Sequence, residues 1–129
     1  MSEHDVQIAV ADALRLFVKP GIIWYHCPNG SFRNKREAAK LKAYGVLPGV
    51  PDLCFVLPPN GQAAYLELKA PKGCLSSGQE AFRDKAVAAG AKWATANTPE
   101  MAADILLSWG VLAKDPLNRP EQRVFGRAA

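Results

Sequence analysis

Apolar and polar residues recur along the chain with helical periods in some segments and strand-like periods in others. Four segments have the helical period, and these are residues 3–18, 34–44, 76–89 and a last segment that starts at Thr98-Pro99. The first is amphipathic, with apolar residues about one turn apart from Val6 to Phe17. The second is basic with a narrow apolar side, so we expect it to pack weakly and to expose most of its surface.

Shorter apolar runs between these segments predict strands. They are residues 22–26, residues 91–96 and the two runs on either side of Pro58-Pro59-Asn60-Gly61. The predicted order of elements is therefore helix, strand, helix, strand, strand, helix, strand, helix. This order is typical of an α/β fold in which helices flank a mixed central sheet. We expect one domain over residues 1–112, followed by a polar, mobile or partner-bound tail over residues 113–129.

The central hairpin carries the most informative polar residues. Asn60-Gly61 favours a two-residue turn, and that turn would place Asp52 opposite Lys69. Asp52, Glu67 and Lys69 would then share one face of the sheet, with the two carboxylates as diagonal neighbours about 5–8 Å apart at Cβ. The two prolines cannot donate to the ladder, so other registers stay open. A loop with an even number of residues keeps the three side chains together, and an odd number separates Asp52 from the others.

Two carboxylates and one ammonium group on a sheet face can support phosphodiester hydrolysis. Mg²⁺ takes oxygen ligands, often one or two carboxylates together with substrate phosphates. A bound metal polarises a phosphodiester and activates water, and a nearby lysine can stabilise the developing charge. The alternatives are a surface ion pair across the hairpin, worth less than about 1 kcal/mol, or a small metal-binding or scaffold protein of another fold.

The positive charge of the chain is concentrated in one segment. The formal net charge of the 129-residue chain is +4, and residues 33–42 alone hold five cations and one acid. Such a cluster, which includes Lys35, Arg36 and Lys40, would bind the phosphates of a polyanion. The open alternative is a solvated helix face.

Composition narrows the class of protein. The apolar fraction of 49% and the charged fraction of 22% are those of a globular protein. We expect no membrane span, because no apolar run approaches about 20 residues, and the acidic start is unlike a signal peptide. A cytoplasmic location is therefore expected. Three cysteines without a C-x-x-C pair support neither a disulfide framework nor a zinc site.

Several separated motifs together resemble one nuclease family. They are EHDVQ (3–7), HCPNGSFR (26–33), LKAYGVLPGVPDL (41–53), YLELKAPKG (65–73) and LSSGQ (75–79). Pro51-Asp52, fourteen further residues and then Glu67-Leu68-Lys69 form the pattern of the PD-(D/E)XK nuclease superfamily. Within it, the chain resembles the VRR-NUC family in its small stand-alone form, which is common in phages and prophages.

The resemblance implies a role for each matching residue of the site. Asp52 and Glu67 would bind the metal together with the backbone carbonyl of Leu68, and Lys69 would be the catalytic lysine. Gln79 and Glu3 would complete the catalytic site. The residues themselves also allow structural roles, because Gln79 fits a capping box and Glu3 favours the positive end of a helix dipole.

The resemblance also implies the substrate and the partner. Asn29 and Arg33 would lie near the DNA phosphate, Gln7 would lie on the helix that completes the site, and the basic helix would extend the DNA contact. The implied activity is that of a Mg²⁺- or Mn²⁺-dependent endonuclease, acting as a homodimer on structured or branched DNA such as four-way junctions. The alternative is a non-catalytic nucleic-acid-binding module that keeps the fold.

Overall fold

The computed structural model describes residues 1–28 and 34–120. Within them lie four helices, which are α1 (Glu3–Phe17), α2 (Lys35–Ala43), α3 (Ser77–Ala88) and α4 (Pro99–Ser108). The strands of the described residues are β1 (Ile23–His26), β2 (Leu53–Leu57), β3 (Gln62–Leu68) and β4 (Lys92–Ala96). Every predicted element is present, in the predicted order, and most bounds agree to within one or two residues.

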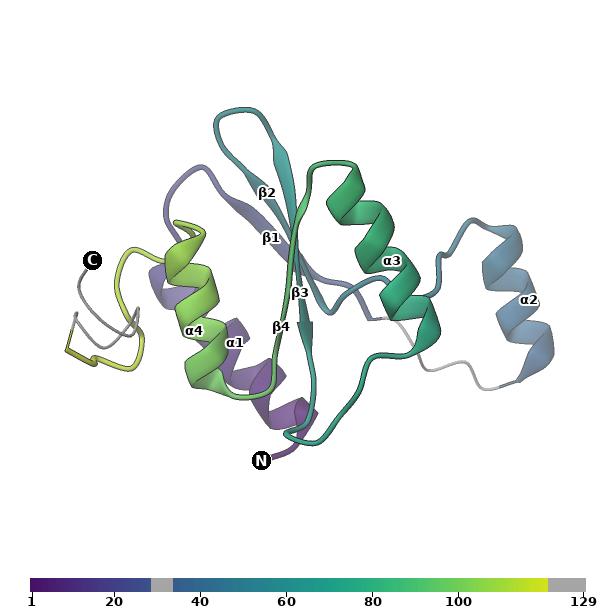
Figure 1. Ribbon diagram of the computed structural model, residues 1–129, viewed down its shortest axis with the longest axis horizontal. Helices are drawn as coiled ribbons and strands as arrows, with labels where there is room; N and C mark the ends of the chain where they lie inside the picture. The colour runs from purple at the N-terminus through teal and green to yellow at the C-terminus, as the bar shows by residue number, and fades with distance from the viewer. Residues whose placement is uncertain (29–33, 121–129) are drawn as a thin grey trace.

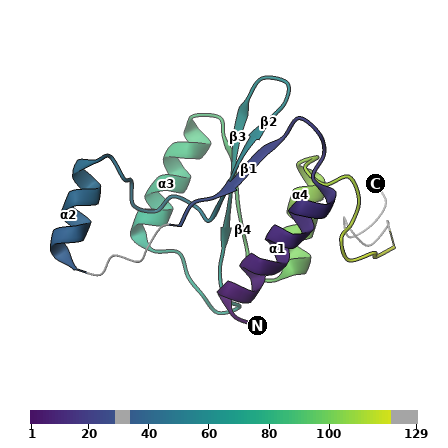
Figure 2. The same cartoon turned by 180° about the vertical axis from the view of Figure 1, so that it is seen from behind.

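The strands form one mixed sheet in the order β1-β2-β3-β4. β1 pairs with β2 and β2 with β3 in antiparallel fashion, whereas β3 and β4 run parallel. Helices α1 and α4 cover one face of this sheet, and α3 lies against the other (Figure 1 and, from behind, Figure 2). The predicted α/β architecture is confirmed.

The main core lies between the sheet and the α1–α4 layer. Alternate residues of β2, Leu53, Phe55 and Leu57, point into this layer and are at most 5% exposed. Val6 and Leu14 of α1 are completely buried against them. This packing fixes the start of α1 beside the end of the sheet, because the buried stripe of α1 allows only one of its sides to face inward.

The opposite face of the sheet is only partly covered. α3 packs over β3, where the rings of Tyr65 and Phe82 meet edge to face with centroids 4.9 Å apart. Farther along the sheet Ile23 is 62% and Tyr25 52% exposed. Away from α3, this face of the sheet is therefore apolar and open to solvent.

Helix α2 stands apart from the sheet, beyond α3, in both views (Figures 1 and 2). None of its residues is buried. Its N-cap is Asn34, whose side chain accepts a hydrogen bond from the backbone N–H of Glu37. The expectation of a weakly packed, mostly exposed basic helix is confirmed.

The register predicted from a two-residue Asn60-Gly61 turn is wrong. Leu57 pairs with Gln62 and Leu53 with Leu66, so residues 58–61 form a four-residue turn. The prolines explain the difference, because Pro58 and Pro59 would have had to sit in the ladder, where neither can donate a hydrogen bond. The loop still has an even number of residues, so the alternation is preserved and the next facing pair is Asp52 with Glu67 instead of Lys69.

The described start of the polar tail is bound to the domain. The Arg119 guanidinium lies 2.8 Å from Asp104 on α4 and 2.8 Å from Asp115. Just before the tail, an isolated bridge pairs Leu112 with Val18 at the C-terminal end of α1. Arg119 and Asp115 are therefore joined to α4 by a partly exposed ion-pair network that had no pattern in the sequence. The mobile or partner-bound state of the tail as a whole stays a prediction. Among the described residues, no helix is both long and apolar enough to cross a membrane.

Candidate metal-dependent nuclease site

Three carboxylates from separate elements meet at one end of the sheet. Glu3 comes from the first turn of α1, Asp52 immediately precedes β2, and Glu67 lies near the end of β3. One ligand oxygen from each side chain lies within 4.8 Å of the others. The fold thus brings together the two acidic residues of the hairpin and, as the motif resemblance implied, the acid of the first helix.

Glu67 is the buried member of this cluster. It is 3% exposed, whereas Glu3 is exposed and Asp52 is half-buried. Burial, and after it the nearby charge of Asp52, raise the pKa of Glu67 to about 8, although Lys69 acts in the opposite direction. Carboxylates held this close repel one another, and a hard divalent cation would relieve that repulsion. The donor set therefore fits such an ion.

A backbone hydrogen bond holds the second carboxylate of the cluster in place. Oδ2 of Asp52 accepts a hydrogen bond from the backbone N–H of Leu68, with N and O 2.8 Å apart. The Leu68 side chain is completely buried in the core. The strand that carries Glu67 thus also orients Asp52, so the two carboxylates cannot move independently.

Lys69 follows directly after β3. Its backbone N–H donates to the carbonyl of Ala96 on the neighbouring strand, 2.9 Å away, which continues the parallel pairing. Because side chains alternate along an extended chain, Lys69 shares the face of Glu67. Its ammonium group is close enough to lower the pKa of Glu67.

Gln79 makes both a helix-capping contact and a contact with Glu67. Its Oε1 accepts from the backbone N–H of Ser76 at 2.8 Å, which completes a capping box at the start of α3. Its Nε2 donates to Oε2 of Glu67 at 3.1 Å. The cap of α3 is therefore also the hydrogen-bond partner of the buried carboxylate.

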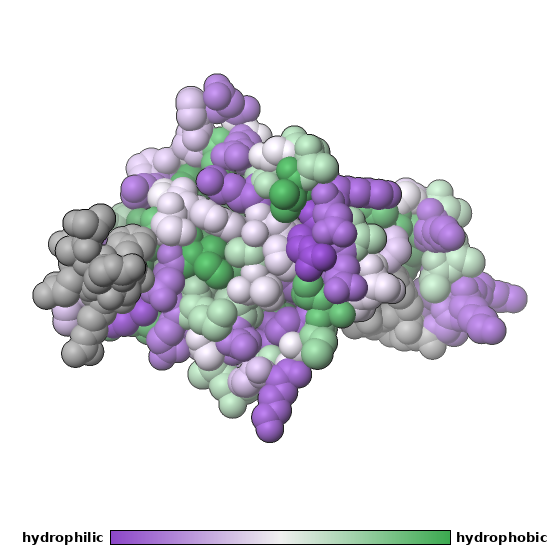
Figure 3. Space-filling model, viewed as in Figure 1, coloured by the Kyte–Doolittle hydropathy of each residue, from purple (hydrophilic) through white to green (hydrophobic). Residues whose placement is uncertain are grey.

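The residues predicted to contact DNA are more widely spread. Lys35, Arg36 and Lys40 of α2 are all exposed, and hydrophilic side chains extend from this end of the molecule (Figure 3). Gln7 is half-buried, one turn after Glu3 on α1. Asn29 and Arg33 lie outside the described residues.

A match to a family model settles the class of this chain. The model describes the VRR-NUC domain and matches residues 2–98. The chain belongs to the VRR-NUC family. The resemblance found in the sequence motifs is thereby confirmed, and with it membership of a nuclease family whose substrate is DNA.

Solved structures agree with this assignment at the level of the fold. One, described as a VRR_NUC domain protein, superposes with a TM-score of 0.70 at 20% identity and covers 84% of this chain and 88% of its own. A second, described as a VRR_NUC domain, gives a TM-score of 0.54 at 18% identity over 82% of this chain and 94% of its own. A comparison with curated proteins found no match.

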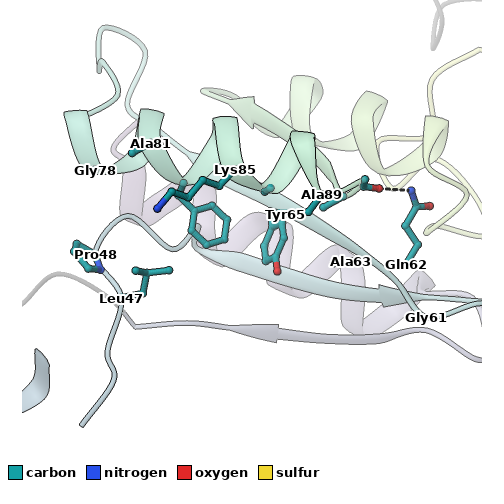
Figure 4. Close-up of a pocket in the computed structure, with 14 residues that line it drawn as sticks. Leu47, Pro48, Gly61, Gln62, Ala63, Tyr65, Gly78, Ala81, Lys85 and Ala89 are labelled. Carbon is teal, nitrogen blue, oxygen red and sulfur yellow. Dashed lines mark hydrogen bonds between the residues drawn. The ribbon is translucent and has the colours of Figure 1, made fainter. Parts of the chain in front are cut away.

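One cavity of the VRR-NUC domain lies beside the acidic cluster rather than around it. It has a volume of about 620 Å³ and lies between α3 and β3 (Figure 4). Tyr65, Phe82 and small residues of α3 line it, whereas Glu3, Asp52 and Glu67 do not. The cavity is therefore separate from the carboxylates, although its residue Gly78 directly precedes Gln79.

His26 lies within one of the sequence motifs, which predict no role for it. In the structure its Nδ1 lies 2.8 Å from the backbone carbonyl oxygen of Asp52. The only hint in the sequence was its place at the end of a strand, in the motif that precedes the basic helix. Its contact with Asp52 depends on the pairing of β1 with β2, which local patterns do not specify.

Proposed function

We propose that this VRR-NUC domain is a divalent-metal-dependent endonuclease that hydrolyses phosphodiester bonds in DNA. The observation that carries the proposal is the meeting of Glu3, Asp52 and Glu67 within 4.8 Å. Surface acids rarely combine such proximity with burial, because an unpaired buried carboxylate is costly. The burial of Glu67 beside two more acids is therefore best explained by a cation.

Four residues of the chain are the proposed metal ligands. Asp52, Glu67 and Glu3 would hold Mg²⁺ or Mn²⁺, and the backbone carbonyl of Leu68 is a further proposed ligand. Both ions accept oxygen donors, so this donor set suits either. When bound, such an ion lowers the pKa of a coordinated water and neutralises charge on the scissile phosphate.

Two further side chains would support the reaction. Lys69, on the face of Glu67, would stabilise the negative charge that develops on the phosphate or orient the attacking water. Gln79 would keep Glu67 in position through the Nε2 hydrogen bond of 3.1 Å. Lys69 therefore acts on the reacting groups, whereas Gln79 acts through a ligand.

DNA binding would extend beyond the carboxylates. The exposed cations of α2 suit sequence-independent contacts with phosphates, and Gln7, Asn29 and Arg33 are proposed to contact the strand near the site. The motif resemblance extends the proposal to a phage or prophage enzyme that acts in the cytoplasm of its bacterial host. It also favours a homodimer that acts on structured or branched DNA, including four-way junctions.

The test is cleavage of a panel of end-labelled DNA substrates. The panel contains single-stranded, duplex, flap, splayed and four-way DNA, each with Mg²⁺, Mn²⁺ or EDTA. Wild type, Asp52→Ala and Asp84→Ala are compared, since Asp84 is an exposed acid of α3 outside the cluster. We expect metal-dependent cutting by wild type and Asp84→Ala, and a loss of at least about a hundredfold in Asp52→Ala.

The same panel separates the competing functions. The best-cut substrate identifies the preferred DNA structure, and sedimentation of the wild type gives its oligomeric state. Binding without cleavage under every metal condition would contradict the proposal and favour a non-catalytic DNA-binding module. Cleavage by Asp52→Ala at the wild-type rate would show that Asp52 is not a metal ligand.

A further inference from the structure

Asp52 is held at both its backbone and its side chain. Its carbonyl oxygen accepts a hydrogen bond from the backbone N–H of Cys27 at 2.9 Å and lies 2.8 Å from Nδ1 of His26. Its Oδ2 accepts from the backbone N–H of Leu68 at 2.8 Å. A carbonyl oxygen has two lone pairs, so both acceptor positions of the Asp52 carbonyl are in use.

The contact with His26 has a defined polarity. A carbonyl oxygen only accepts hydrogen bonds, so the imidazole must carry its hydrogen on Nδ1. In the neutral ring this leaves Nε2 without a hydrogen. The side chain of His26 is exposed, and therefore this hydrogen bond, rather than burial in the core, is what fixes its orientation.

Asp52 needs external support because of where it lies. It precedes β2, so it is outside the regular ladder that begins at Leu53. Its carboxylate oxygen lies within 4.8 Å of those of Glu3 and Glu67, and each of these groups repels it when ionised. The hydrogen bonds from β1 and β3 oppose this displacement from two sides.

We propose that His26 is a positioning residue of the site. Through Nδ1–H it holds the Asp52 carbonyl, and thereby the direction in which the Asp52 carboxylate faces the other two acids. The inference rests on the proposed function in one respect, because it takes Asp52 as a metal ligand. Groups that orient metal ligands typically change metal affinity or activity by about 10–100-fold.

Three substitutions separate this role from other roles of the ring. His26→Asn keeps an N–H donor at the δ position, His26→Gln moves the donor to the ε position, and His26→Ala removes it. Because His26 is exposed, all three variants are expected to fold, and thermal unfolding without metal checks this. Binding of Mn²⁺ alone, measured by calorimetry without DNA, is the main readout.

We expect His26→Ala and His26→Gln to bind Mn²⁺ about 10–100-fold more weakly than wild type, and His26→Asn to remain close to wild type. NMR of the imidazole nitrogens of His26 in the wild type should show hydrogen on Nδ1. Parallel cleavage assays should follow the order of the Mn²⁺ affinities.

Other results would overturn either the role of His26 alone or the role of His26 together with the proposed metal site. Wild-type affinity in all three variants, or hydrogen only on Nε2, would overturn the role of His26 while leaving the nuclease proposal intact. Rescue by Gln but not by Asn would also overturn it and assign the function to Nε2. No Mn²⁺ binding by correctly folded wild type would overturn the proposed metal site together with this inference.

Discussion

Gln79 connects the N-terminal cap of α3 to the buried carboxylate of Glu67. One end of its amide accepts from the Ser76 backbone at 2.8 Å, and the other donates to Glu67 at 3.1 Å. The position of α3 and the orientation of Glu67 are therefore coupled through a single side chain. The capping contact and the contact with Glu67 therefore coexist in the fold.

Two substitutions at Gln79 should separate these roles. Gln79→Glu keeps an acceptor for the capping box but replaces the donor to Glu67 by a further negative charge. Gln79→Ala removes both, and Ser76→Ala weakens the cap while leaving the amide in place. We expect the two Gln79 variants to change Mn²⁺ affinity or cleavage by about 10–100-fold, and Ser76→Ala to lose about 1 kcal/mol of stability with little effect on metal binding. Equal metal affinity in all three would show that the Glu67 contact is incidental.

Lys69 should affect the rate more than metal binding. Lys69→Met keeps the length of the side chain and removes the charge that would stabilise the phosphate transition state. We expect cleavage to fall by about 10²–10³-fold while Mn²⁺ affinity stays within a small factor of wild type. Lys72→Met, three residues away and exposed, is the matched control. A rate equal to that of the control would exclude Lys69 from catalysis.

The stability of the metal-free protein should depend on pH through Glu67. Its pKa is raised from 4.5 to about 8 in the folded state, so this group stabilises the fold fully below about pH 4.5. As the pH rises from 4.5 to about 8, the unfolded chain has released the proton of Glu67 that the folded state still retains. The contribution of Glu67 to the free energy of unfolding therefore falls, by at most about 1.4 kcal/mol per pH unit, until it is lost near pH 8.

Urea unfolding in EDTA at several pH values checks this dependence. Glu67→Gln cannot ionise, so the difference in unfolding free energy between wild type and this variant should change between pH 5 and 8 in the stated direction. A difference that is constant with pH would show that Glu67 has an ordinary pKa.

The sequence predicted the elements well and the contacts between them only in part. Local periods and caps gave all of the described helices and strands, because each depends on neighbouring residues. The acids Asp52 and Glu67 were placed together correctly, but their register was not, since Pro58 and Pro59 exclude the tighter turn. The contact of His26 with Asp52 depends on strand pairing across 26 residues of sequence, which no local pattern encodes.

The basic helix should contribute to the salt dependence of DNA binding. Arg36→Gln combined with Lys40→Gln removes two exposed charges of α2. If both contact phosphates, the slope of log affinity against log salt should decrease in magnitude by about 2, with uniformly weaker binding to all sequences. Lys19→Gln combined with Lys114→Gln removes two exposed charges beyond the far end of α1 and serves as the control. An unchanged slope would show that these side chains of α2 are solvated and do not contact phosphates.

A close backbone contact should make Gly49 indispensable. Gly49 has φ +83°, and a Cβ added there would lie 2.2 Å from the carbonyl oxygen of Gly78 at the start of α3. This contact places the loop that leads to Asp52 directly against the segment that carries Gln79. Gly90, at the other end of α3, has φ +96° but no atom within 4 Å of an added Cβ. Gly90→Ala is therefore a control for the backbone conformation alone.

We expect Gly90→Ala to cost about 1–2 kcal/mol and to leave the relative Mn²⁺ affinity unchanged. Gly49→Ala should cost more than this, because backbone atoms cannot give way as a flexible side chain does. It should also weaken Mn²⁺ binding, since separating the loop from α3 moves Asp52 relative to Glu67 and its partner Gln79. Chemical unfolding and calorimetry on both variants check this, and equal effects of the two substitutions would show that the contact does not position the site.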